Sequence, residues 1–219
     1  MGKINLFIDE TNEVLAKKEL VLAAVKVAEE YSFAKLKIDW NIDVLIRSAK
    51  QKFLNAKDYV CGHTYDDNLI RLIVEDGFSD FEISEVLVHE LCHAARWGKN
   101  NEWTDTLFDA LIFEGLAVCF AEDFSRDNAK RQFYMETIVN RTDKENKEIF
   151  SKLSGHLRDT DYNYERIFNG NNDGLPRWAG YSLGYYLVKK YLKKSGKTVE
   201  EAFADKYAEV EVALQKGYC

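Results

Sequence analysis

The stretch VHELCH occupies residues Val88–His93 and has the pattern HExxH. It lies in a segment that predicts a helix, because Ser79–Glu82 has the form of a capping box at a helix start. His89 and His93 are separated by one helical turn, which places them on one face with their Cβ atoms about 6 Å apart. Two imidazoles placed in this way can bind one Zn²⁺ at about 2.0–2.1 Å each.

Glu90 projects about 100° around the helix from His89 and is poorly placed to be a third ligand. It can instead accept the proton of a water that the metal activates. Two helical histidines flanking a glutamate also arise by chance, or in a metal site without catalysis. A third ligand is needed to distinguish these interpretations.

Glu114 is the candidate for that third ligand. It lies in an otherwise apolar stretch, Leu111–Ala121, which predicts a second long helix. Burying an ionised carboxylate there costs free energy unless it is paired or coordinates a metal. The alternative is a glutamate that faces solvent. Glu122 and Asp123 are weaker ligand candidates, because they lie at the polar end of the same helix.

Composition narrows the class of protein. The chain has 219 residues, a net charge of −7 and 46% hydrophobic residues, which is enough for a sizeable core in one domain. The acidic balance argues against nucleic acid and against an anionic membrane surface as partners. No apolar run resembles a signal peptide or a membrane span, so we expect a cytoplasmic protein. The four cysteines lack paired spacing and are expected to be reduced thiols.

The expected fold class is α+β. We expect a single domain over residues 1–219, with a β-containing lobe at 1–77 and a mostly helical lobe at 78–219 that begins with the HExxH helix. Alternation of apolar and polar residues predicts a strand at Ile4–Ile8, and a run rich in Leu, Ile and Val predicts another at Asn68–Glu75. A helix is expected between them at Glu13–Glu30. Residues 36–48 fit either a strand or the start of a helix.

The second lobe is expected to consist of helices joined by short loops. Residues 159–176 are polar and contain the breakers Gly170, Gly174 and Pro176, which predicts a loop. The predicted helices are 79–97, 104–124, one or two within 127–157, 178–194 and a terminal helix capped by Thr198.

Three blocks of this sequence resemble the gluzincin group of metallopeptidases. They are Val86–Trp97, Glu114–Ala117 and Pro176–Gly184, and within the group the chain is most similar to an uncharacterised family of predicted zinc-dependent proteases. The resemblance covers about residues 60–195. It implies a zincin-like fold in which a sheet edge strand, matched by Asn68–Glu75, lies beside the substrate cleft.

The resemblance also implies roles for individual residues. His89, His93 and Glu114 would bind zinc, and Glu90 would be the catalytic base. Gluzincins use a Tyr or His from the C-terminal helices to stabilise the oxyanion, and Tyr181 is the first choice here. Tyr185 and His156 are the alternatives. The Asp that often follows the glutamate ligand by four positions is Val118 in this chain, so the groups that orient the histidines come from elsewhere.

Three functions compete at this stage. The leading hypothesis is a hydrolase that uses Zn²⁺ and Glu90 to cleave peptide bonds in a peptide or protein substrate. The second is a domain that holds a metal and binds a protein or peptide without cutting it, and the third is a structural module with an accidental motif. The motif does not specify the substrate, the choice between endopeptidase and exopeptidase activity, or the oligomeric state.

Overall fold

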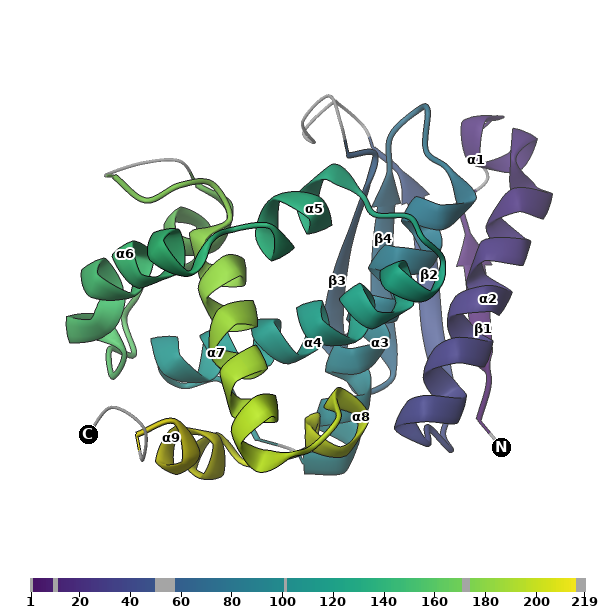
Figure 1. Cartoon of the computed structure of the whole chain (residues 1–219). Helices are drawn as coiled ribbons and strands as arrows, with labels where there is room; N and C mark the ends of the chain where they lie inside the picture. Colours follow the sequence, from purple (N-terminus) through teal and green to yellow (C-terminus); the bar gives the residue numbers. More distant parts are fainter. Residues whose placement is uncertain (1, 10–11, 50–57, 101, 171–173, 216–219) are drawn as a thin grey trace. The chain divides into compact units, whose positions relative to one another are not determined.

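The computed structural model describes residues 2–9, 12–49, 58–100, 102–170 and 174–215 (Figure 1). The chain divides into two compact units, and each takes two separate stretches of sequence. Unit 1 comprises Met1–Lys99 with Phe120–Tyr134, and unit 2 comprises Asn100–Cys119 with Met135–Cys219. The single domain over 1–219, with lobes at 1–77 and 78–219, stays a prediction.

The α+β class is confirmed, since a small sheet in the N-terminal part precedes a mostly helical remainder. The sheet of unit 1 has the strand order β1-β2-β4-β3, in which β1, β2 and β4 run parallel and β3 is antiparallel to β4. The strands are β1 Ile4–Ile8, β2 Ile42–Ser48, β3 Val60–Asp66 and β4 Leu69–Val74. Residues 36–48 therefore supply a strand, in agreement with one of the two alternatives.

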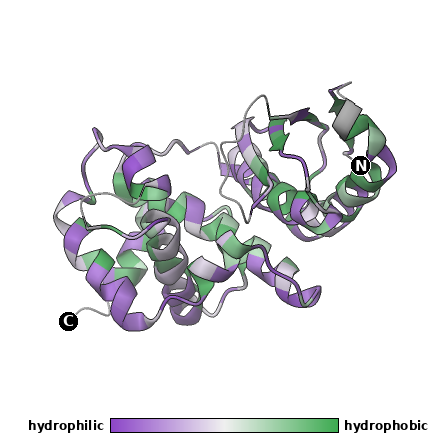
Figure 2. Cartoon of the chain, turned by 90° about the horizontal axis from the view of Figure 1, so that it is seen from above, coloured by the Kyte–Doolittle hydropathy of each residue, from purple (hydrophilic) through white to green (hydrophobic). Residues whose placement is uncertain are grey.

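One face of the sheet carries the core of unit 1. Alternate residues of β2 and β4 are fully buried there, because a strand directs successive side chains to opposite faces. Two long helices lie against the sheet (Figure 1), and the hydroxyl of Ser84 on α3 lies 3.1 Å from the carbonyl oxygen of Ala24 on α2. The strands and helices of this unit carry extended apolar stretches (Figure 2). The buried strand residues are Ile42, Val44, Ile46, Ile70 and Leu72.

The predicted helix Glu13–Glu30 is wrong in its extent. The chain forms a short helix α1, Asn12–Ala16, and a long helix α2, Lys18–Leu36. Helix α2 ends where Lys37 adopts a left-handed conformation with φ 53° and donates its N–H to the carbonyl of Phe33. The residue at this cap is a lysine and not the usual glycine, so the sequence carries no glycine signal for the helix end.

The predicted edge strand is also wrong. Strand β4 matches Asn68–Glu75 but lies inside the sheet, between β2 and β3, and the edge is β3. Strand β3 was not predicted, because its sequence VCGHTYD lacks a run of branched apolar residues. His63 lies on this strand, is exposed, and packs its ring against that of Tyr65 with centroids 4.5 Å apart.

Helix α3, Asp80–Asn100, carries the HExxH stretch and begins as predicted. The N–H of Ser79 donates to Glu82 at 2.8 Å, and the N–H of Glu82 lies 3.2 Å from the Ser79 hydroxyl oxygen. These two bonds satisfy donors that a helix start leaves free. Thirteen residues of α3 are buried, including both histidines and Glu90, so this helix runs through the interior of unit 1.

Helix α4, Leu107–Asp127, belongs to both units, because the division falls at Cys119. Thr106 and Asp109 cap its start through reciprocal bonds of 2.9 and 3.2 Å. In unit 2 it packs closely on α7, Ala179–Ser195. A Cβ on Gly115 would lie 2.3 Å from the carbonyl oxygen of Gly184, so both glycines are needed for this approach.

The remaining helices lie in the C-terminal part of the chain. The expected loop 159–176 contains a helical turn, η2, because residues 165–169 form a short π-helical segment. The expected terminal helix is two helices, and Thr198 caps the first. Among the described residues, no helix combines the length and apolarity needed to span a bilayer. The elements are α5 Phe133–Val139, α6 Asp143–Leu153, η1 Ser154–His156, η2 Glu165–Asn169, α8 Val199–Ala202 and α9 Tyr207–Gln215.

Candidate metal centre

His89 and His93 bring two imidazole nitrogens together on one face of α3. Their Nε2 atoms are 3.0 Å apart, and the rings meet edge to face with centroids 4.7 Å apart. Both residues are buried, with exposed fractions of 9% and 5%. Two nitrogens bound to a tetrahedral zinc at about 2.0–2.1 Å stand about 3.3 Å apart, so this pair is close to the required spacing.

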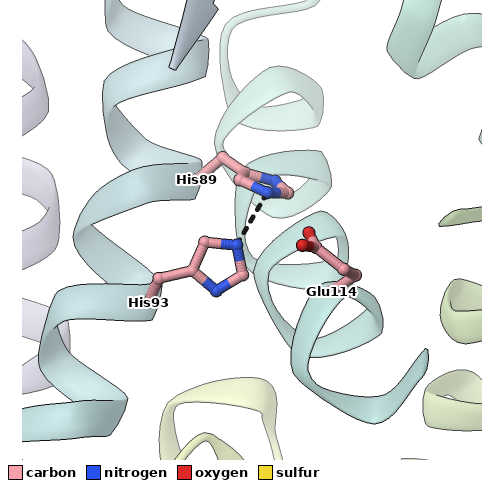
Figure 3. Close-up of side chains that lie close together, drawn as sticks. All are labelled: His89, His93 and Glu114. Carbon is pink, nitrogen blue, oxygen red and sulfur yellow. Dashed lines mark hydrogen bonds between the residues drawn. The ribbon is translucent and has the colours of Figure 1, made fainter. Parts of the chain in front are cut away.

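Glu114 is buried on α4, as the apolar sequence around it indicated. One carboxylate oxygen of Glu114 and one ring nitrogen from each of His89 and His93 all lie within 4.8 Å of one another (Figure 3). Among the described residues, this is the group of His, Cys, Asp or Glu side chains that could hold a metal ion. The donor set of two neutral imidazoles and one carboxylate suits zinc.

Tyr164 holds the carboxylate of Glu114 and was missed in the sequence. Its hydroxyl donates to Oε1 of Glu114 at 2.6 Å and lies 3.2 Å from the hydroxyl of Tyr181. The residue is 37% exposed, but desolvation of its hydroxyl and the charge of Glu114 raise the pKa of Tyr164 well above its usual value. Tyr164 is therefore a neutral hydrogen-bond donor to Glu114.

Tyr181, the first choice for oxyanion stabilisation, contacts Tyr164 in this group. It lies on α7, hydrogen-bonds with Tyr164 and packs edge to face on Phe168 with centroids 5.2 Å apart. His156 instead forms an exposed pair with Asp159 at 2.8 Å. Tyr185 lies under the ammonium group of Lys189, which is 5.8 Å from its ring centroid.

A residue of strand β3 contacts the side chain of Glu90, and no sequence motif indicates this contact. The hydroxyl of Thr64 lies 2.6 Å from Oε2 of Glu90, and both residues are buried. Gly62, on the same strand, leaves the space that the Glu90 side chain occupies. Burial and the charge of Glu90 together raise the pKa of the neighbouring Cys61 thiol to about 11, so Cys61 is neutral at pH 7.

Two further cysteines lie on the helices α3 and α4. Cys92 and Cys119 are buried packing residues, with exposed fractions of 2% and 3%, and neither forms a disulfide. Cys219 lies outside the described residues. Among the described residues, Cys61, Cys92 and Cys119 thus take part in no disulfide, and their reduced state stays a prediction.

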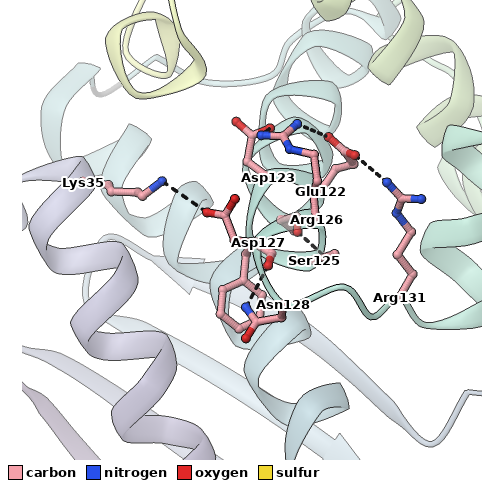
Figure 4. Close-up of polar contacts among 10 residues, drawn as sticks. Lys35, Glu122, Asp123, Ser125, Arg126, Asp127, Asn128 and Arg131 are labelled. Carbon is pink, nitrogen blue, oxygen red and sulfur yellow. Dashed lines mark hydrogen bonds and ion pairs between the residues drawn. The ribbon is translucent and has the colours of Figure 1, made fainter.

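Glu122 and Asp123 have cationic partners at the other end of α4 (Figure 4). Glu122 accepts from Arg131 at 2.7 Å, and Asp123 pairs with Arg126 at 2.8 Å. The charges of Asp123 and Glu122 raise the pKa of Arg126. These ion pairs explain how two acidic residues on α4 are accommodated without a metal.

A comparison with protein-family models matches residues 22–211 to a family described as predicted Zn-dependent protease (DUF2268). The match spans the strands β2 to β4 and includes His89, Glu90, His93, Glu114, Tyr164 and Tyr181. No curated protein matches the chain.

Proposed function

The chain belongs to this family of predicted Zn-dependent proteases, and from that premise we propose that it is a zinc-dependent hydrolase of the gluzincin type that cleaves peptide bonds. The observation that supports the proposal most directly is the buried group of His89, His93 and Glu114, whose potential ligand atoms lie within 4.8 Å of one another. These three residues would hold one zinc ion.

A bound zinc would act as a Lewis acid and lower the pKa of water to about 7. Glu90 is the proposed general base. Its Oε2 accepts from Thr64, and no described residue donates a hydrogen bond to Oε1, so Oε1 remains available to a water. The protonated carboxyl would then donate to the leaving amine nitrogen.

Tyr181 is the proposed electrophile that stabilises the oxyanion. Its hydroxyl lies 3.2 Å from that of Tyr164, which itself donates to Glu114, so the two tyrosines form a chain of hydroxyl groups ending at a proposed metal ligand. Tyr181→Phe should lower kcat and leave zinc content unchanged. Unchanged kcat would remove Tyr181 from the mechanism.

The edge strand for substrate binding is proposed to be β3 instead of β4. Strand β3 pairs only with β4 among the described strands and contacts the catalytic helix through Thr64. An extended peptide can add to such an edge by backbone hydrogen bonds. This mode of binding suits a short peptide or an unfolded segment of a protein as substrate. The partner class is therefore a peptide or protein substrate.

The test uses purified full-length chain, zinc analysis and hydrolysis of fluorescein-labelled casein. We expect one zinc per chain, and loss of hydrolysis in Glu90→Gln with zinc retained. Glu85→Gln is the matched control, because Glu85 is also a buried glutamate of α3 but bonds to Ser125 and Gln132. It should hydrolyse casein like the wild type.

Two outcomes would contradict the proposal. Full hydrolysis by Glu90→Gln would exclude Glu90 as the base. Wild-type protein that binds zinc and cleaves no casein or mixed-peptide substrate would favour the second candidate, a metal-holding domain that binds peptides without cutting them.

A further inference from the structure

Strand β3 presents two residues to Glu90 that no motif marks. The hydroxyl oxygen of Thr64 lies 2.6 Å from Oε2 of Glu90 and 3.0 Å from the backbone oxygen of the same residue. Thr64 is 5% exposed and Glu90 is 6% exposed. The contact joins the edge of the sheet to the middle of the HExxH helix within unit 1.

The direction of this hydrogen bond follows from the groups involved. A threonine hydroxyl has one proton, and both nearby oxygens of Glu90 are acceptors. The carboxylate oxygen is nearer and carries charge, so it receives the stronger bond. Thr64 thereby occupies Oε2 and fixes the rotation of the carboxylate about its last bond.

Gly62 determines where the other oxygen lies. A Cβ built on Gly62 would be 2.5 Å from Cγ of Glu90 and 2.6 Å from Oε1. No side chain can stand there unless Glu90 moves. Thr64 therefore holds Oε2 of Glu90 by a hydrogen bond, and Gly62 leaves room for Oε1 of the same carboxylate.

We propose that Thr64 is a positioning residue for Glu90, and that Gly62 provides the space in which Oε1 faces the reacting water. This inference rests on the proposed function. With Oε2 occupied by Thr64, Oε1 is the atom that takes the proton as the water O–H bond breaks, and the same proton passes to the leaving nitrogen. Strand β3 would thus orient Glu90 as well as offer backbone hydrogen bonds to the substrate peptide.

The first experiment compares Thr64→Val with Thr64→Ser in casein hydrolysis by the zinc-loaded full chain. Valine has the shape of threonine without the hydroxyl, and serine keeps the hydroxyl. We expect Thr64→Val to lower kcat about tenfold or more, the effect of one hydrogen bond to a charged group, with KM and zinc content unchanged. Thr64→Ser should recover most of kcat.

Gly62→Ala tests the space beside Oε1. It should also lower kcat at unchanged zinc content, because the new methyl group displaces the Glu90 side chain. Gly155→Ala is the matched control, since a Cβ at Gly155 meets no atom within 4 Å. Wild-type kcat in Gly62→Ala would overturn the role of Gly62.

A second experiment needs no activity and uses metal-free protein. Thermal unfolding is measured for Thr64→Val in the wild-type chain and in a Glu90→Met background, where the side-chain acceptor is missing. If Thr64 bonds the carboxylate, its substitution lowers Tm clearly in the wild type and by less than half as much in the Glu90→Met background. Equal shifts of Tm in both backgrounds would overturn the contact.

The outcomes separate this inference from the proposed function. A wild type that hydrolyses casein while Thr64→Val keeps its kcat, or while the valine and serine variants lose kcat equally, overturns the positioning role alone. A wild type that binds zinc and hydrolyses nothing overturns the proposed function and, with it, the role of Oε1.

Discussion

Four buried glutamates on α3 and α4 each have a different kind of partner. Glu85 bonds to Ser125, Glu90 to Thr64, Glu114 to Tyr164 and Glu122 to Arg131. An arginine contacts the carboxylate of Glu122, whereas hydroxyl groups contact those of Glu85, Glu90 and Glu114. Each of these contacts offsets part of the cost of burying a carboxylate.

Glu85 gives the pH dependence that the structure predicts for stability. Burial raises its pKa from 4.5 to about 7, although Ser125 and Gln132 donate to it, and the nearby Asp58 adds to the rise. The folded state therefore holds this proton to a higher pH than the unfolded state. Its contribution to stability is full below pH 4.5 and is lost as the pH rises to about 7.

Glu85→Gln should remove that loss. The amide carries no charge and can donate to the Ser125 hydroxyl, which also contacts the carbonyl oxygen of Ala121 at 2.8 Å. Relative to the wild type, the free energy of unfolding of the variant should rise by up to about 3 kcal/mol between pH 4.5 and pH 8. Urea denaturation of metal-free protein measures it. Parallel pH curves for the two chains would refute the assignment.

The residues of the candidate site could be predicted where neighbouring positions in the sequence mark them, but not where they meet only through the fold. His89, Glu90 and His93 form a contiguous motif, and the apolar surroundings of Glu114 indicated its burial. Thr64 and Tyr164 lie 26 and 50 positions from the residues they contact. Neither stands in a pattern of its own, because a hydroxyl that finds a carboxylate through the fold leaves no periodic signal.

At the scale of elements, capping residues made the helices easier to predict than the strands. Ser79 and Thr198 begin helices through the capping boxes read from the sequence, and Gly196 ends α7 with a φ of 72°. Strand order depends on pairing between distant segments. The Cys-Gly-His-Thr run of β3 was therefore missed, and β4 was assigned to the edge that β3 occupies.

The contact between α4 and α7 predicts the effect of one methyl group. Gly115→Ala adds a Cβ that would lie 2.3 Å from a backbone oxygen and 2.8 Å from a methyl carbon of Val188. The carbonyl group of Gly184 cannot rotate away as a side chain could, so α4 and α7 must move apart. The overpacking cost, about 1–3 kcal/mol, should exceed the gain in helix propensity of about 1 kcal/mol.

Urea denaturation would show this as a lower midpoint at an unchanged slope. Gly155→Ala is again the control, because the added methyl group there meets open space. A midpoint for Gly115→Ala equal to that of the wild type would mean that α4 and α7 tolerate a larger separation.

At the scale of the whole molecule, the proposed zinc should stabilise the folded chain. A ligand at 100 times its Kd adds about 2.7 kcal/mol, which corresponds to a rise in Tm of about 5 °C or more for a chain of this length. Chelation with EDTA should lower the Tm of the wild type by that amount. Differential scanning calorimetry with and without EDTA measures the shift.

Glu114→Ala makes the test specific to the proposed ligand. The variant should bind zinc weakly, so EDTA should change its Tm little. Glu122→Gln is the matched control, because Glu122 is a buried glutamate on the same helix with arginine partners. A Glu114→Ala chain that retains full zinc occupancy and the full EDTA response would exclude Glu114 as a ligand.

The interleaving of the two units in the sequence has a genetic consequence. The chain passes from one unit to the other after Lys99, after Cys119 and after Tyr134. A gene fragment that stops at Lys99 encodes the HExxH helix but omits Ser125 and Gln132, which are the partners of Glu85. Neither unit can therefore be copied, lost or exchanged as one uninterrupted coding segment.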